Sequence, residues 1–313
     1  MAERTFPRPV EDALRLLSGD RVLGASSLLG TAAGAFFALS SASSAGNGRQ
    51  FVSELEDLVR EVIGVQPLMA PFYNLGAAVL DGSDPLLSFP KLKKAVSHAA
   101  ARYAEDAEKG KEKACHAGAG LVKDGARILT LSSSSAVLRS LELAKKDWKK
   151  FDVIVLESRP MLEGRNAAKK LAALQIPVEL ATDAALASEV RRADLVLIGA
   201  DALTEEVLVN KSGTLAVAMI AKDAGVPMFA VAECSKLLPD AILPESDRPR
   251  NPNEVWESAP QGVAVRNRYF ERVPLKYVRT IAMEDGPCKK EDVARKLEKA
   301  GPGLEKLAGI LSK

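Results

Sequence analysis

Residues 152–214 alternate short apolar runs with helical patterns, and no other stretch of the chain constrains its fold as strongly. The apolar runs cover residues 153–156, 178–181 and 195–198, and charged residues or glycine bound them. Runs of this length and composition are typical of strands buried on both faces of a sheet. An amphipathic helix pattern separates the first run from the second. This alternation predicts an α/β fold with a doubly wound, mostly parallel, Rossmann-like sheet.

The apolar periodicity changes near Arg127, and this change predicts two domains. Before Arg127 the pattern is helical, with a long helix predicted over residues 91–122. After it, the run at residues 128–131 predicts the first strand of the sheet. We therefore expect a helical N-terminal domain over residues 1–122 and an α/β domain over residues 123–313.

The second half of the chain continues the same pattern with one interruption. Residues 226–232 and 278–283 are apolar and predict two further strands. Between them, residues 239–258 are rich in proline and charge, which predicts an irregular excursion. The tail at residues 289–313 is helix-forming but contains Gly301, Pro302 and Gly303.

Composition excludes several classes of protein. The formal net charge is +2 and no dense basic cluster is present, so direct binding to nucleic acid is not expected. The three cysteines, at positions 115, 234 and 288, form no CxxC pair, which argues against a disulfide framework and a zinc or other metal site. No apolar run reaches about 18 residues, and the N-terminus lacks the apolar core of a signal peptide. We therefore expect a cytoplasmic protein that does not contact membranes.

Polar residues follow the predicted strands at the edge where open α/β sheets bind ligands. They form three groups: 157–160, 182–183 and 199–201. Residues 210–214, Asn-Lys-Ser-Gly-Thr, are predicted to open another helix. This run matches neither GxxxxGK[ST] nor GxGxxG, so no nucleotide loop and no cofactor is predicted.

Four serines, Ser132, Ser133, Ser134 and Ser135, end the first predicted strand and lead into a helix. Small hydroxyls and free backbone amides at a helix start can bind a phosphate. Serine is also a preferred residue for capping a helix, so an ordinary cap is the alternative.

The charged candidates have comparable alternatives. Arg159 offers a planar fork to a phosphate or carboxylate, although Glu157 could neutralise it in a structural pair. Arg165 is a weaker candidate that could simply decorate a helix. Lys211, next to Asn210, supplies a charge for a phosphate.

Two other kinds of side chain could contribute proton chemistry. Asp201 ends a strand and could act as an acid or base if burial raises its pKa, or it could cap a helix. Cys234 follows a strand at the same sheet edge, although buried, inert thiols are the commoner case. His98 and His116 lie in the helical region, where structural roles are expected.

Five motifs in order resemble the translation-initiation-factor-two-B superfamily. They are ESRP at 157–160, EGR at 163–165, TD at 182–183, GAD at 199–201 and NKSGT at 210–214. Two longer stretches, 124–144 and 267–286, are also similar to segments of this family. The family includes the alpha, beta and delta regulatory subunits of the eukaryotic exchange factor. It also includes methylthioribose-1-phosphate isomerase and archaeal ribose-1,5-bisphosphate isomerase.

The resemblance implies a sugar-phosphate pocket, an N-terminal phosphate loop at Gly24 and Ala25, and a homodimer formed through the α/β domain. The isomerases carry a catalytic cysteine just after the first strand and an aspartate in the GAD motif. Here Asp201 is present, but Ser132 occupies the cysteine position, and Leu23 stands where the isomerases have an arginine. A serine hydroxyl ionises far less readily than a thiol, so both departures argue against standard isomerase chemistry.

Three functions remain open from the sequence. The first is a factor-two-B-like protein that binds a phosphorylated sugar or nucleotide without isomerising it, as a homodimer or in a higher assembly with related subunits. The second is an aldose–ketose isomerase acting on a phosphorylated ribose, and the third is an assembly subunit without a ligand. For the first two, the expected catalytic positions are Asp201 and Ser132, the latter inactive. The expected ligand contacts are Gly24, Ala25, Ser133, Ser134, Ser135, Arg159, Arg165, Asn210 and Lys211.

Overall fold

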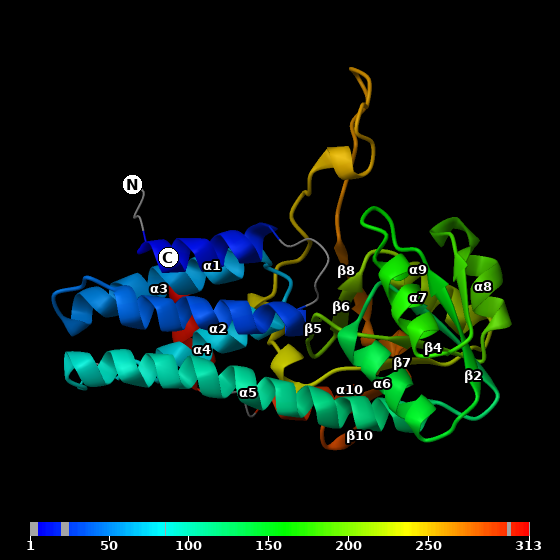
Figure 1. Ribbon diagram of the computed structural model, residues 1–313, viewed down its shortest axis with the longest axis horizontal. Helices are drawn as coiled ribbons and strands as arrows, with labels where there is room; N and C mark the ends of the chain where they lie inside the picture. Colours follow the sequence, from blue (N-terminus) through cyan, green and yellow to red (C-terminus); the bar gives the residue numbers. More distant parts are fainter. Residues whose placement is uncertain (1–5, 20–24, 85, 299–301, 313) are drawn as a thin grey trace. The chain divides into compact units, whose positions relative to one another are not determined.

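The computed structural model describes residues 6–19, 25–84, 86–298 and 302–312. The chain divides into two compact units, which Figure 1 shows with their helices and strands labelled. One unit comprises residues 1–109 and 298–313, and the other comprises residues 110–297. Among the helices that the structure describes, none combines the length and the apolar character of a membrane span.

The first unit is helical, as the sequence predicts. Its elements are α1 (Arg8–Gly19), α2 (Ala25–Ala42), α3 (Gly48–Val65), α4 (Ala70–Asp81), the first part of α5 (Phe89–Leu121) and α11 (Pro302–Leu311). The side chain of Asn47 caps α3 by accepting the N–H of Gln50, at 3.0 Å. The apolar stripe of α3 is buried, and Phe36, Phe51 and Phe72 are fully buried within the unit.

The two units divide the chain differently from the sequence pattern. The sequence pattern puts the domain boundary after residue 122, whereas the boundary between the two compact units falls within α5, between Lys109 and Gly110. The reason is that the last turns of α5 pack in the same apolar cluster as the sheet, with Ala114 and Ala119 as members.

The C-terminal tail also differs from the expected α/β assignment, because α11 packs against α4 in the helical unit. A Cβ atom on Gly303 would lie 2.5 Å from the carbonyl oxygen of Ala77, so only glycine permits this approach. Leu307 on the same helix is fully buried. Sequence alone does not reveal this packing, since more than 200 residues separate the two helices along the chain.

The second unit contains a seven-stranded sheet in the order β10-β9-β7-β4-β1-β2-β3. Its strands are β1 (Ala126–Leu131), β2 (Phe151–Leu156), β3 (Val178–Ala181), β4 (Leu195–Ile198), β7 (Met228–Val231), β9 (Thr280–Met283) and β10 (Gly286–Cys288). All neighbouring pairs are parallel except β9 and β10. The predicted doubly wound, mostly parallel sheet is therefore confirmed.

Helices cover both faces of this sheet. They are α6 (Ser135–Lys146), α7 (Glu163–Ala173), α8 (Leu186–Arg192), α9 (Thr214–Asp223) and α10 (Lys290–Leu297). One apolar cluster joins alternate residues of the central strands to α8, α9 and α10. The other joins the remaining strand residues to α5, α6 and α7. Because successive strand residues point to opposite faces, buried strands need this double cover.

The third predicted strand is not buried on both faces. β3 is the last strand in the sheet order, and Leu180 on it is 48% exposed. An edge strand has a neighbour on one side only, so less of its surface is covered. The apolar content of residues 178–181 predicts the strand correctly but not its place in the sheet.

A small antiparallel sheet was not expected from the sequence. It consists of β5 (Ala202–Leu203), β6 (Val207–Lys211) and β8 (Phe270–Pro274). Asn210 and Lys211 therefore lie at the end of a strand, and α9 begins only at Thr214. Gly213 between them has φ 102°, a left-handed conformation that glycine adopts without strain.

The predicted excursion precedes β8. Residues 243–268, here called the arm, contain only the short 3-10 helix η4 (Pro252–Glu254). In Figure 1 the arm is the amber segment that projects from the sheets of its own unit.

Candidate functional site

The strand order reverses between β1 and β4, which makes the carboxyl ends of these strands the expected ligand site. The chain passes from β1 to β2 and β3 on one side, and then returns to β4 on the other. Ser132 follows β1 and Gly199 follows β4. A Cβ atom on Gly199 would lie 2.2 Å from Ser134 Oγ, so the two loops are in direct contact.

Hydrogen bonds fix the ends of β1 and β2 and the segment after β3 to one another. The backbone N–H of Ser132 donates to Ser158 Oγ at 2.6 Å. The N–H groups of Ser158 and Arg159 donate to the Asp183 carboxylate, at 2.8 and 2.6 Å. Ser132 and Ser158 have φ values of 63° and 64°, which residues other than glycine seldom adopt. Asp183, which the sequence placed at this sheet edge but not among the ligand contacts, thus positions Arg159.

The serine run is in part a helix cap. Ser134 Oγ accepts the N–H of Val137 at 3.4 Å and caps α6. Ser132, Ser133 and Ser135 are half-buried beside it. Capping, the alternative left open by the sequence, therefore describes Ser134, and the other three hydroxyls stay candidates for ligand contact.

The two candidate arginines have different surroundings. Arg159 is exposed, and its Nη2 donates to the backbone carbonyl of Val255, in the arm, at 2.9 Å. Arg165 Nη2 donates to Glu157 Oε2 at 2.9 Å. The expected alternative partner of Arg159, Glu157, thus pairs with Arg165 instead. The Arg159 guanidinium thus contacts a neutral carbonyl rather than a carboxylate, so its positive charge is available to an anionic ligand.

Lys211 is buried and already paired. Its Nζ lies 2.7 Å from Oε1 of Glu163, the first residue of α7, which is also buried. Burial raises the pKa of the Glu163 carboxyl, and Lys211 beside it opposes the rise. Glu163 Oε2 has no hydrogen-bond partner within the part of the chain that the structure describes. The charge expected to bind a phosphate is therefore balanced by a carboxylate of the EGR motif.

The helix start after Lys211 is also occupied. Glu271 Oε1, on β8, accepts the N–H groups of Gly213 at 2.7 Å and Leu215 at 2.9 Å. Asn210 Nδ2 donates to Thr214 Oγ1 at 3.1 Å. The Glu271 carboxylate therefore accepts hydrogen bonds from the backbone N–H groups at the helix start where the sequence predicts a phosphate. Sequence reasoning missed Glu271 because its partners lie far along the chain.

Asp201 lies between β4 and β5 rather than at a helix cap. Its side chain is half-buried, and its backbone N–H donates to the carbonyl of Val209 at 2.8 Å. This bond sets the GAD turn beside the strand that carries Asn210 and Lys211. The structure thus brings the serine run and the GAD turn to the ends of β1 and β4, and Arg159 to the neighbouring end of β2.

Three other sequence candidates remain: Gly24, Ala25 and Cys234. Gly24 lies outside the described residues and Ala25 is the first residue of α2 in the helical unit, so their phosphate role stays a prediction. Cys234 follows β7, and its N–H donates to the Glu284 carboxylate at 2.9 Å. Burial, with Glu284 beside the thiol, raises the pKa of Cys234 to about 12. A thiol of this kind stays protonated at neutral pH.

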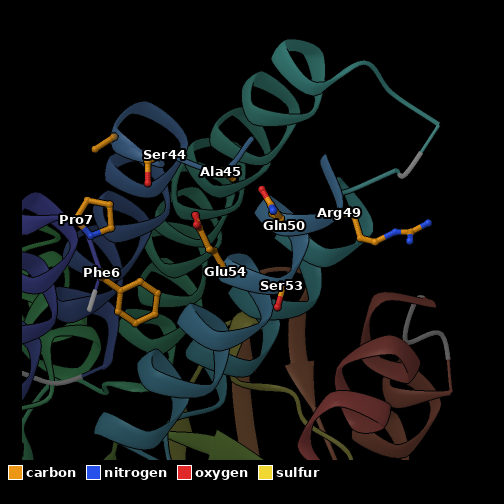
Figure 2. Close-up of a pocket in the computed structure, with 9 residues that line it drawn as sticks. Phe6, Pro7, Ser44, Ala45, Arg49, Gln50, Ser53 and Glu54 are labelled. Atoms are coloured by element: carbon orange, nitrogen blue, oxygen red, sulfur yellow. The ribbon is translucent and has the colours of Figure 1, made fainter. Parts of the chain in front are cut away.

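A separate pocket of about 730 Å³ lies in the helical unit, between the residues before α1 and the start of α3. Two of its polar groups are already engaged. Glu54 Oε2 accepts from the Ser43 hydroxyl at 2.6 Å, and Gln50 Oε1 accepts from the N–H of Gly46 at 2.8 Å. Figure 2 shows that the Arg49 side chain extends away from Glu54. Because Glu54 and Gln50 are already paired and Arg49 extends away from Glu54, the sheet edge is the better candidate.

Comparison with known proteins agrees with this reading of the fold. Residues 21–290 match the family model described as the initiation factor 2 subunit family. A Pyrococcus horikoshii protein named "Putative translation initiation factor eIF-2B subunit 2-like" is 32% identical over 287 residues, which cover 90% of this chain and 96% of that protein. The "Ribose 1,5-bisphosphate isomerase" of Methanocaldococcus jannaschii is 31% identical over 265 residues, covering 83% and 85%.

Solved structures show the same fold. The translation initiation factor eIF-2B of Pyrococcus horikoshii OT3 aligns with a TM-score of 0.78 and 30% identity, covering 90% of this chain and 97% of that one. The 5-methylthioribose 1-phosphate isomerase from the same organism aligns with a TM-score of 0.68 and 22% identity, covering 96% and 88%. This second likeness concerns the fold alone.

Proposed function

The chain belongs to the initiation factor 2 subunit family, and on this premise we propose that it binds a phosphorylated sugar or nucleotide without isomerising it. The ligand would bind at the carboxyl ends of β1 and β4. The observation that carries this proposal is the residue after β1: Ser132, where the resemblance to the isomerases predicts a cysteine.

The surroundings of Ser132 offer no substitute for a thiolate. Its backbone N–H donates to Ser158 Oγ. The two histidines of the sequence, His98 and His116, belong to none of the site motifs that could place a base beside its hydroxyl. Cys234 is no replacement, because its thiol pKa is raised to about 12. A serine needs an adjacent base to exchange protons at neutral pH.

The groups that could hold a phosphate are Arg159 and the start of α6. Among the described residues the Arg159 guanidinium donates to the neutral Val255 carbonyl, which leaves its charge for a ligand, and a guanidinium binds phosphate in bidentate fashion. The N-terminus of α6, with Ser133 and Ser135 beside it, adds backbone donors and hydroxyls. Lys211 is less suited to this task, since Glu163 balances its charge.

One observation favours the isomerase alternative. Asp201 stands in the GAD motif at the carboxyl end of β4, next to the proposed ligand position, and a relative of 31% identity is named a ribose 1,5-bisphosphate isomerase. Under this alternative Asp201 would move the proton, and another group would complete the return step. A chain without any ligand, serving assembly alone, is the remaining alternative.

For assembly we propose a homodimer formed through the α/β unit, or a larger complex with related subunits. Exposed apolar side chains on this unit, Leu180 on β3 and Met219 on α9, would support such a contact. A monomeric mass in light scattering at micromolar concentration would exclude the dimer.

The function is tested by ligand binding and turnover on the same preparation. Pentose phosphates and nucleotides are screened by thermal shift, where a ligand at 100 times its Kd adds about 2.7 kcal/mol of stability. We expect one of them to bind, and neither ribose 1,5-bisphosphate nor 5-methylthioribose 1-phosphate to be isomerised. Turnover by the native chain would support the isomerase, and the absence of any binding would support assembly alone.

A further inference from the structure

We infer that Arg159 is shared between the bound phosphate and the arm, so that ligand binding releases the arm from the site. The inference rests on the proposed function and adds a regulatory step to it. It starts from one contact: the hydrogen bond of 2.9 Å from Arg159 Nη2 to the carbonyl oxygen of Val255.

Hydrogen bonds and an ion pair hold the base of the arm in place. The buried Asp247 carboxylate accepts the N–H groups of Tyr269 at 2.7 Å and Phe270 at 3.3 Å. Its other oxygen pairs with Arg250 Nη2 at 2.9 Å. Glu254 accepts from the Tyr269 hydroxyl and from Asn267 Nδ2. These bonds tie the two limbs of the arm to the start of β8, so the arm has a defined position relative to that strand.

Tyr269, at the base of the arm, provides a second connection to the site. The Tyr269 ring lies 5.1 Å from Lys211 Nζ and 4.7 Å from Arg250 Cζ. Both distances are within the range of cation–π attraction. A change in the position of Lys211 would therefore alter its contact with the Tyr269 ring, and Tyr269 is hydrogen-bonded to Asp247 and Glu254 of the arm. The arm is thus connected to the proposed ligand site directly by the bond from Arg159 and indirectly, through Tyr269, by Lys211.

A phosphate would compete with Val255 for Arg159. The carbonyl is a neutral acceptor of one hydrogen bond, whereas a phosphate offers charge-assisted, bidentate bonds that are roughly twice as strong each. Nη2 carries two hydrogens, one on each bidentate edge of the guanidinium, so the bond to Val255 occupies one edge, and a phosphate that binds this edge must displace the carbonyl. A ligand that gains these bonds only when Arg159 leaves the arm must favour the released arm.

The next residue provides a reporter for this change. Trp256 is 49% exposed, and the only other tryptophan of the sequence is Trp148, which is 89% exposed. In a Trp148→Phe background all tryptophan fluorescence comes from Trp256. Its emission and its quenching by acrylamide therefore report on the arm beside Val255.

The experiment uses the Trp148→Phe full-length chain with ribose 5-phosphate, AMP and inorganic phosphate as probes. Binding is measured by calorimetry, and Trp256 quenching is measured on the same samples. We expect the quenching constant to rise at saturation with any probe that binds. The variant Arg159→Ala should show the raised quenching without a probe, and no further rise with one. Arg191→Ala, an exposed arginine paired with Asp223 at 2.9 Å, is the matched control and should behave like the parent.

The outcomes separate this inference from the proposed function. Calorimetric binding with unchanged Trp256 quenching would overturn the release of the arm and leave the proposed function standing. Unchanged quenching in probe-free Arg159→Ala would also overturn it. If no probe binds at all, the proposed function fails, and the ligand-driven release fails with it.

Discussion

Lys211 Nζ and Glu163 Oε1 lie 2.7 Å apart, and this buried ion pair joins the end of β6 to the first residue of α7. The pair connects the NKSGT and EGR motifs, which are far apart in sequence. Because each charge is buried, removing one of them leaves the other without compensation.

We therefore expect Lys211→Met to destabilise the protein by about 3–5 kcal/mol at pH 7. The substitution keeps the volume of the aliphatic stem and removes only the charge. Urea unfolding measures the change. The control is Arg191→Met, which breaks the exposed pair with Asp223 and should cost about 0–1 kcal/mol. Equal losses in the two variants would contradict the burial argument.

The cost of Lys211→Met should depend on pH in one direction. Without Lys211 the main opposing interaction is lost, and burial raises the pKa of Glu163 in the folded state further above the ordinary value of 4.5. A carboxyl with a raised folded pKa contributes stability below its unfolded pKa, and this stability is lost as the pH rises through the folded pKa. The difference in stability between native and variant should thus grow as the pH rises from the folded-state pKa of Glu163 in the native chain, itself raised above 4.5, towards the higher folded-state pKa in the variant. Unfolding curves of both proteins between pH 4.5 and 8 check this, and a constant difference would refute it.

Gly199 should not tolerate a side chain. A Cβ atom there would lie 2.2 Å from Ser134 Oγ and 2.8 Å from Ser134 Cβ, so the α6 cap must move. We expect Gly199→Ala to cost about 1–3 kcal/mol, the usual range for overpacking. Gly120→Ala, on α5 with open space around it, is the control and should be neutral or slightly stabilising. Combining Gly199→Ala with Ser134→Gly should restore part of the loss.

Glu271 should matter to the start of α9. Its carboxylate oxygen accepts two backbone N–H groups, at 2.7 and 2.9 Å. Hydrogen bonds to a charged group contribute about 1.5–3 kcal/mol, so Glu271→Ala is expected to lose an amount in this range. Thermal unfolding measures the loss, and Glu257→Ala in the exposed part of the arm is the reference. An unchanged Tm for Glu271→Ala would show that the cap is dispensable.

How far the sequence predicts this fold depends on the range of the interactions. β3 and β4 begin and end at the predicted residues, because the sequence itself shows a short run bounded by proline, charged residues or glycine at each of them. β6 was missed because it is completed by β8, whose residues pair with it from the far side of the arm. The tail helix α11 was misplaced for the same reason.

The site follows the same rule. The serine run and Asp201 were recognisable because they follow strand ends directly. Glu163, Glu271 and the contact of Arg159 with Val255 were not, since each depends on a partner brought close by the fold. The EGR motif was the only available signal for Glu163.

The last prediction concerns the chemistry of Ser132. A cysteine thiol ionises near pH 8.5 and is tuned towards neutrality at a helix start, whereas a serine hydroxyl has no such route without a base. Ser132 lies two residues before Ser134, the N-cap of α6, and its φ of 63° is held by the bond from its N–H to Ser158. Ser132→Cys therefore places a thiol where a thiolate would be favoured, at little cost to the backbone.

Each acid or base function contributes typically 10²–10⁴-fold to a rate. We expect the native chain to lack measurable isomerisation of ribose 1,5-bisphosphate and the variant to gain it, with a rate that rises with pH as the thiol ionises. Ser132→Cys combined with Asp201→Asn should lose the gained activity, which separates site chemistry from contamination. Robust turnover by the native chain, abolished by Asp201→Asn, would instead establish the isomerase alternative.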